Sequence, residues 1–159
     1  MSIIQIDLEK LKKDSWSDQE MKNVERMTDF VQNLMNNHNF DYVNKEFGHH
    51  PYTQHSRGIP DGIRNLVNYV QDFAKRSPEY TYDVKHIYAD GDYVTFHSHA
   101  TTKIKHRGDD GRGFNIIDTW KLVDNQIVEH WDAIQPLSLF MRLYVLLIGG
   151  RIANNNGVF

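Results

Sequence analysis

The sequence predicts one α+β domain in which helices cover one face of an antiparallel sheet. In the first half of the chain, apolar residues recur at helical spacing over about residues 17–76. From residue 80 onward the spacing changes to simple alternation, and short turn motifs separate the alternating segments. Helices followed by strands, in a chain of 159 residues, are typical of a single α+β domain with one core.

Three helices are expected before residue 78. Ser17 and Glu20 match a capping box, which predicts a helix from about residue 18 to residue 37. A short helix is expected over residues 40–47 and a third over residues 61–76, where Asp61 is expected to act as the cap. The segment between them, residues 51–62, is irregular because it is punctuated by proline and glycine.

Four strands are expected after the helices, over residues 80–89, 93–106, 114–123 and 126–135. The dipeptide Asp90-Gly91 is typical of a tight hairpin turn, and Asp124-Asn125 forms another. A polar loop over residues 108–113 joins the middle pair. Three hairpin connections in succession predict an antiparallel meander.

The two ends of the chain are expected to lie outside the domain, which spans residues 17–136. Residues 1–16 are interpreted as a loosely held extension, and they lack the apolar segment of a signal peptide, so a cytoplasmic protein is expected. Residues 137–159 contain an apolar helix that is shorter than the roughly 20 residues of a membrane span. We expect it to pack in a homodimer; a pocket lid and contact with a membrane surface are the alternatives.

Composition excludes several classes of partner and cofactor. The net charge is −3 and the basic residues form no stripe, so no nucleic-acid partner is expected. The absence of cysteine excludes disulfides and thiolate catalysis. The sequence has no phosphate-binding glycine loop and no nucleophile elbow. We therefore expect no cofactor and no membrane partner, and a small molecule as the ligand.

Asp118 is the most informative polar residue. It lies in the middle of a predicted strand and shares a face with Ile116, Trp120 and Leu122. A carboxylate on an apolar face must be paired, hydrogen-bonded or protonated. The resulting pKa shift suits a general acid or base. The alternative is a structural partnership of Asp118 with His97, His99 or Arg112.

In the preceding predicted strand, His97 and His99 lie on one face and Phe96 lies on the other. The two histidines are about 7 Å apart along the strand. With a carboxylate, two such histidines could bind a metal, but no further ligand continues the motif and no metal site is expected. His97 is nearer the strand centre and is interpreted as the pocket residue.

In the last strand, His130 and Asp132 alternate with Trp131. If His130 and Asp132 face inward, they could form a relay with Asp118. If Trp131 faces inward instead, it supplies an apolar wall to the pocket. The catalytic candidates are therefore Asp118, His97 and Asp132. The substrate-binding candidates are Tyr52, Gln54, His55, His99, Trp120, His130 and Trp131, of which the first three lie in the irregular segment and could reach over the pocket mouth.

Five short segments carry a resemblance to a known family: residues 52–55, 58–62, 91–99, 118–121 and 126–135. They resemble the SnoaL-like polyketide cyclases of the NTF2-like superfamily, over roughly residues 20–136, and the segment IVEHWD is the most specific. The resemblance implies a conical α+β barrel with a deep pocket. It also implies aldol condensation without a cofactor, with a carboxylate as the general acid or base. Asp118 is the position matched to that carboxylate, and His97, His99 and Asp132 are the alternatives.

We therefore expect a cyclase, or a related isomerase, lyase or hydrolase, that acts on a small and largely apolar carbonyl compound. A non-catalytic module that binds a small molecule and an oligomerisation domain are the alternatives.

Overall fold

The computed structural model describes residues 3–148 and 153–156. Its helices are α1 (Leu8–Leu11), α2 (Asp18–Val31), α3 (Phe40–Phe47), α4 (Ile63–Arg76) and α5 (Leu139–Ile148), with a π-helical turn at Gln32–Asn36 and a 3-10 turn at Ile104–His106. Its strands are β1 (Thr53–Gln54), β2 (Thr81–Asp90), β3 (Tyr93–Thr101), β4 (Phe114–Val123) and β5 (Gln126–Pro136).

The five strands form one sheet in the order β1-β5-β4-β3-β2. Strands β2 to β5 are the predicted antiparallel meander. The sheet is nevertheless mixed, because β1 pairs in parallel with β5. This strand was not predicted, since two residues are too few to show an alternating pattern. Strand β3 also ends earlier than predicted, because a 3-10 turn replaces its last residues.

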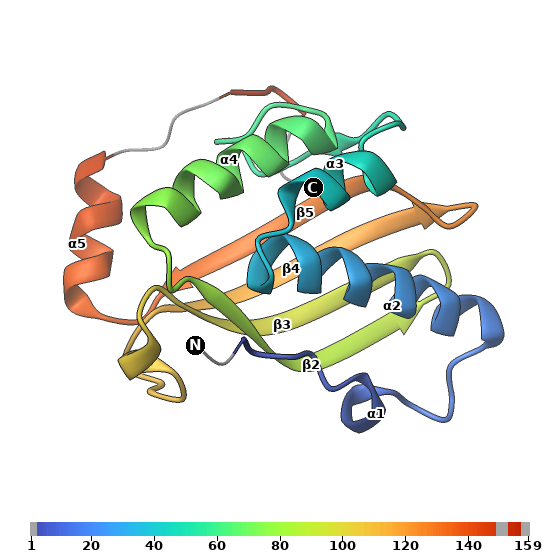
Figure 1. Ribbon diagram of the computed structural model, residues 1–159, viewed down its shortest axis with the longest axis horizontal. Coiled ribbons are helices and arrows are strands. Elements are labelled where there is room, and N and C mark those ends of the chain that lie inside the picture. The colour runs from blue at the N-terminus through green and yellow to red at the C-terminus, as the bar shows by residue number, and fades with distance from the viewer. Residues whose placement is uncertain (1–2, 149–152, 157–159) are drawn as a thin grey trace.

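Helices α2, α3 and α4 lie over one face of the bent sheet (Figure 1), which confirms the predicted α+β fold class. The largest fully buried side chains come from both layers, and include Trp120 and Phe96 of the sheet and Phe30 and Met27 of α2. Burial of such side chains is the main stabilising contribution to a domain of this size. The core therefore joins the sheet to α2, and α4 adds Ile63, Leu66, Val67 and Val70 to it.

Helix α2 begins where the capping box predicts. The Ser17 hydroxyl accepts a hydrogen bond from the Glu20 backbone N–H at 3.3 Å, and the Ser17 N–H donates to the Glu20 carboxylate at 2.8 Å. The prediction that Asp61 caps α4 is wrong. Gly62, with a φ of 93° that suits glycine, precedes that helix. The Asp61 carboxylate instead accepts the Gln54 N–H at 2.8 Å.

The N-terminal extension is attached more firmly than predicted. The Gln32 side chain accepts a hydrogen bond from the Ile6 N–H at 3.0 Å and donates one to the Ile4 carbonyl at 3.1 Å. Leu8, Leu11 and Trp16 are partly buried against the core. These contacts hold the extension to the end of α2.

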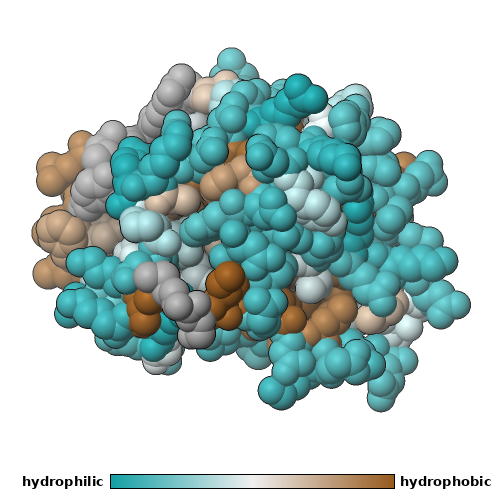
Figure 2. Space-filling view, in the orientation of Figure 1, coloured by the Kyte–Doolittle hydropathy of each residue, from teal (hydrophilic) through white to brown (hydrophobic). Residues whose placement is uncertain are grey.

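Helix α5 stands at one end of the sheet, apart from the other helices (Figure 1). Most of its apolar side chains are exposed, with Leu147 at 83%, and apolar atoms gather at this end of the surface (Figure 2). The homodimer expected through this helix stays a prediction. Within residues 3–148 and 153–156, no helix is both long enough and apolar enough to cross a membrane.

Candidate functional site

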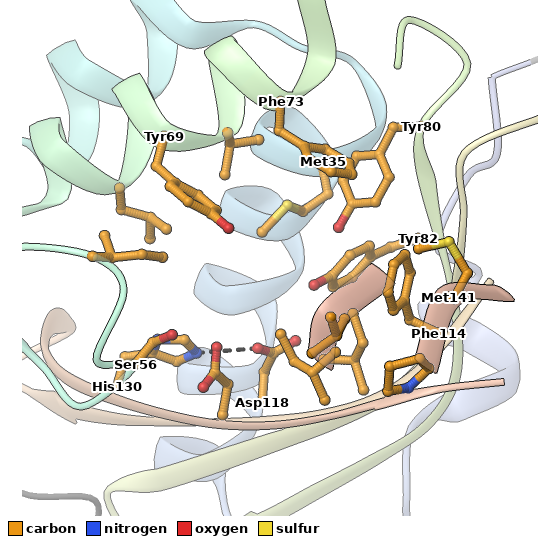
Figure 3. Close-up of a pocket in the computed structure, with 18 residues that line it drawn as sticks. Met35, Ser56, Tyr69, Phe73, Tyr80, Tyr82, Phe114, Asp118, His130 and Met141 are labelled. Carbon is orange, nitrogen blue, oxygen red and sulfur yellow. Dashed lines mark hydrogen bonds and ion pairs between the residues drawn. The ribbon is translucent and has the colours of Figure 1, made fainter. Parts of the chain in front are cut away.

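A cavity of about 340 Å³ lies between the sheet and α4, and α5 closes one end of it (Figure 3). This volume is within the range of small-molecule sites, at its lower end. Most of the lining is apolar and comes from α4, α5 and the sheet. The apolar lining residues are Met35, Ile59, Leu66, Val70, Phe73, Phe114, Ile116, Ile134, Pro136, Met141 and Val145.

Asp118 and His130 form a buried pair at the floor of this cavity. The register pairs Asp118 with Asp132 and Trp120 with His130, so alternation turns Asp118, His130 and Asp132 to the same face. The Asp118 Oδ1 lies 3.1 Å from the His130 Nε2. The two residues are only 3% and 4% exposed. Of the two alternatives for β5, the structure thus shows His130 and Asp132 facing inward.

The electrostatic surroundings of Asp118 suit proton transfer. Burial raises the pKa of its carboxyl, and the hydrogen bond and charge attraction of His130 partly oppose this, while Asp132 raises it further. Among the described residues, the second oxygen, Oδ2, has no hydrogen-bond partner. One carboxyl oxygen is therefore held by His130, and the other is buried without a hydrogen-bond partner among the described residues.

His130 is in turn held from behind by residues of the irregular segment. Its Nδ1 lies 2.9 Å from the Gln54 Oε1, and the Gln54 amide donates to the Tyr52 hydroxyl at 3.2 Å. The ring of Trp120 stacks on the imidazole with 5.2 Å between centroids. Tyr52, Gln54 and Trp120, predicted to bind substrate, do not line the cavity and support His130 instead.

Three tyrosine hydroxyls point into the cavity from the side opposite the floor: those of Tyr69, Tyr80 and Tyr82 (Figure 3). Burial raises the pKa of both Tyr80 and Tyr82, and the charge of Asp118 raises them further. These two phenols therefore stay protonated and able to donate hydrogen bonds. None of the three was predicted, although alternation along the strand expected over residues 80–89 puts Tyr80 and Tyr82 on one face.

His97 and His99 do not belong to the cavity. His97 pairs with Ile117 in the register, on the face opposite Asp118, and its Nε2 lies 2.6 Å from the Asn115 Oδ1. His99 donates from its Nε2 to the Arg112 carbonyl at 2.7 Å. The structure therefore places His97 and His99 away from the cavity, because the register turns Phe96, and not His97, to the face of Asp118.

His55 and Trp131 also lie on the outer face. Their rings stack with 4.7 Å between centroids, and the His55 Nε2 lies 2.9 Å from the Glu129 carboxylate. Neither lines the cavity, so the structure does not bring them together with Asp118 and His130 as predicted. Among the residues that the structure describes, no three His, Cys, Asp or Glu side chains are grouped to hold a metal ion.

The sequence of residues 24–130 matches the SnoaL-like domain family. These residues are about two thirds of the chain. The chain belongs to this family. The predicted resemblance is thereby confirmed. In this SnoaL-like domain the match includes Asp118 and ends at His130, the two residues of the buried pair.

Solved structures share the fold of this SnoaL-like domain. A candidate polyketide cyclase from Bacillus cereus is 22% identical, with a TM-score of 0.65, over 83% of this chain and 87% of that one. An NTF2-like protein of unknown function from Mesorhizobium loti is 16% identical, with a TM-score of 0.57, over 76% and 96%. A candidate ketosteroid isomerase from Kribbella flavida is 12% identical, with a TM-score of 0.56, over 74% and 80%. No curated protein matches the sequence.

Proposed function

We propose that this SnoaL-like domain is an enzyme that performs general acid/base chemistry without a cofactor on a small, largely apolar carbonyl compound. The observation that carries the proposal is the buried Asp118, which has one oxygen on His130 and the other unpartnered, at the floor of an apolar cavity. A carboxyl group placed in this way is suited to removing and returning a proton.

In the proposed reaction, Asp118 takes a proton from the carbon next to a substrate carbonyl through its Oδ2. The electron pair of the broken C–H bond becomes an enolate, whose oxygen accepts hydrogen bonds from the phenols of Tyr80 and Tyr82. In a ring closure, the enolate carbon attacks a second carbonyl of the same molecule, and the new alkoxide takes the proton back from Asp118. In an isomerisation, the proton returns to another carbon.

The lining also favours a neutral substrate. Among the residues that the structure describes, the cavity lining includes two carboxyl groups, of Asp118 and Asp132, and neither lysine nor arginine. A carboxylate or phosphate on the ligand would lose its hydration without gaining a cationic partner. The structural neighbours support proton-transfer chemistry in a coarse sense, because some are named as candidate cyclases and one as a candidate ketosteroid isomerase.

Exchange of α-protons for deuterium tests the proposal without knowledge of the natural substrate. Neutral bicyclic ketones and 1,3-diketones are incubated with the protein in D₂O, and loss of the α-proton signals is followed by NMR. We expect the wild type to accelerate exchange of at least one compound, and Asp118→Asn to lower that rate by about 100- to 10,000-fold.

Asp83→Asn is the matched control, because Asp83 pairs with Lys85 on the outside of β2 and lies outside the cavity. It should exchange protons at the wild-type rate. Full activity in Asp118→Asn would refute the assignment of the base. Ketones that bind in the cavity without any exchange would instead support a non-catalytic binding module.

A further inference from the structure

The orientation of the Gln54 side chain is determined by its neighbours. Its Oε1 lies 2.9 Å from the Ser56 backbone nitrogen and 2.9 Å from the His130 Nδ1. A backbone N–H can only donate, so the amide atom that faces Ser56 must be the oxygen acceptor. The amide nitrogen is then left to donate to Tyr52, as observed. The reversed amide would place two donors against each other at Ser56.

This orientation decides which nitrogen of His130 carries hydrogen. The atom facing Nδ1 is the same acceptor oxygen, so Nδ1 must be protonated to make the hydrogen bond. In a neutral imidazole the other nitrogen, Nε2, is then a bare acceptor that faces the Asp118 Oδ1. A proton held by the pair therefore lies on the line between Asp118 and His130. A protonated Asp118 can donate this proton in a hydrogen bond to the Nε2 of neutral His130. Alternatively, an ionised Asp118 can accept a hydrogen bond from the Nε2 of a protonated His130.

The backbone around Gln54 has little support of its own. Within the described part of the chain, strand β1 is two residues long and pairs with β5 alone. The next residue adds one bond, from the His55 N–H to the His130 carbonyl at 2.9 Å. A strand as short as this gains little from its own ladder. Gln54 is nevertheless fully buried, so its position must be held by contacts from elsewhere.

Residues 153–156 provide those contacts. The Asn156 side-chain amide donates to the Gln54 carbonyl at 2.9 Å and to the Asp61 carboxylate at 2.7 Å. The same Asp61 oxygen accepts the Gln54 N–H. The Asn154 amide donates to the carbonyls of Ser56 and Ile59 at 3.1 and 2.9 Å. The C-terminal segment thus fixes both sides of the residue that contacts His130.

We propose that Gln54 is a positioning residue that fixes the protonated nitrogen of His130 and that Asn154 and Asn156 are the clamp that holds it there. This rests on the proposed function only in its kinetic consequence. The site then consists of a proton-transfer pair on β4 and β5, a positioning amide on β1, and a clamp about 100 residues away in sequence.

The first test is spectroscopic and does not need a substrate. In protein with ¹⁵N-labelled histidine, the His130 signals are identified by their loss in His130→Gln. We expect the wild-type Nδ1 to keep the chemical shift of a protonated ring nitrogen across the pH range in which the protein is folded. An Nδ1 with the shift of a bare nitrogen, in neutral His130, would overturn the proposal.

Variants of Gln54 separate positioning from a merely structural role. Gln54→Leu removes the acceptor, so the neutral ring should become a mixture of its two tautomers, and kcat should fall roughly 10- to 100-fold, as for other residues that orient a functional histidine. Gln54→Glu keeps an acceptor for both Ser56 and Nδ1 and should restore the Nδ1-protonated form. Equal histidine spectra in the wild type and Gln54→Leu would contradict the assignment.

The clamp is tested from outside the buried site. Asn156→Ala should accelerate hydrogen exchange of the Ser56 amide, and it should lower kcat by a larger factor than it changes KM. Asn155→Ala is the matched control, because Asn155 is exposed and makes none of the hydrogen bonds of the clamp within the described tail. Identical exchange and kcat in the two variants would overturn the clamp. If Gln54→Leu changes the tautomer of His130 but the wild-type protein exchanges no α-protons, the positioning role of Gln54 is supported and the proposed function is refuted.

Discussion

Asn36 joins the end of the first long helix to the edge of the sheet, and its replacement is expected to be costly. Its Oδ1 accepts the Tyr82 N–H and the Thr81 hydroxyl, each at 2.7 Å, and its Nδ2 donates to the Tyr82 carbonyl at 3.0 Å. Because β2 is an edge strand, the amide bonds to the main chain of Tyr82 as a neighbouring strand would.

The size of the effect follows from these three bonds. Asn36, Thr81 and Tyr82 are 7%, 2% and 4% exposed, so water replaces the lost partners poorly in Asn36→Ala. A buried polar group that loses its partner costs about 1–3 kcal/mol. Some rehydration at the edge strand reduces the sum, and we expect the free energy of unfolding to fall by about 3 kcal/mol.

Urea denaturation followed by circular dichroism measures this change. Asn37→Ala is the control, because Asn37 is the adjacent residue but is exposed, and it should change the stability by less than about 1 kcal/mol. If Asn36→Ala unfolds within about 1 kcal/mol of the wild type, water or a rearranged strand replaces the amide, and the reasoning from unsatisfied groups fails.

Three further predictions concern charge and exposure. Burial raises the pKa of folded Asp118 above its usual value of 3.8, so the stability that comes from its bound proton is complete at low pH and is lost as pH rises through the raised value. In urea melts, the stability of Asp118→Asn relative to the wild type should therefore increase as pH rises above 3.8, and a difference that does not change with pH would contradict this. Burial likewise raises the pKa of Tyr52, Tyr80 and Tyr82. In an absorbance titration, three of the eight tyrosines should therefore stay protonated until the protein unfolds. Ionisation of all eight near pH 10 would refute the burial of these three. Leu147 is 83% exposed on α5, so Leu147→Lys should change the unfolding free energy by less than about 0.5 kcal/mol. If α5 packs in the expected dimer, the same substitution should also lower the sedimentation coefficient of the protein. An unchanged sedimentation coefficient would count against that dimer.

The sequence predicted α2 to α5 and four of the five strands because each has its own local signal, whereas the four-residue helix α1 was not predicted. The capping box at Ser17 and the alternation after residue 80 both depend on neighbours a few positions away. The extra strand β1 has no such signal, since Thr53 and Gln54 become a strand only by pairing with β5. Contacts between distant segments are what the pattern cannot show.

The same distinction explains which of the predicted site residues the structure brings together in the cavity. Asp118 stands out because a carboxylate in an apolar strand requires a partner, and the structure supplies His130. His97 was placed on the wrong side because alternation says which residues share a face within one strand but not how the faces of two strands match. That match is set by the pairing of Phe96 with Asp118, which only the register between β3 and β4 reveals.

The alternation of β5 divides one short stretch of sequence between two surfaces. His130 and Asp132 reach the cavity, while Glu129 and Trp131 lie on the other side with His55. A substitution at every second position can therefore alter the chemistry of the cavity without touching the outer surface, and the reverse also holds. The insertion of a single residue within β5 would exchange the two sets, turning an indole toward the space where the imidazole of His130 now lies. Families built on such a strand can diversify by replacement far more readily than by changes in length.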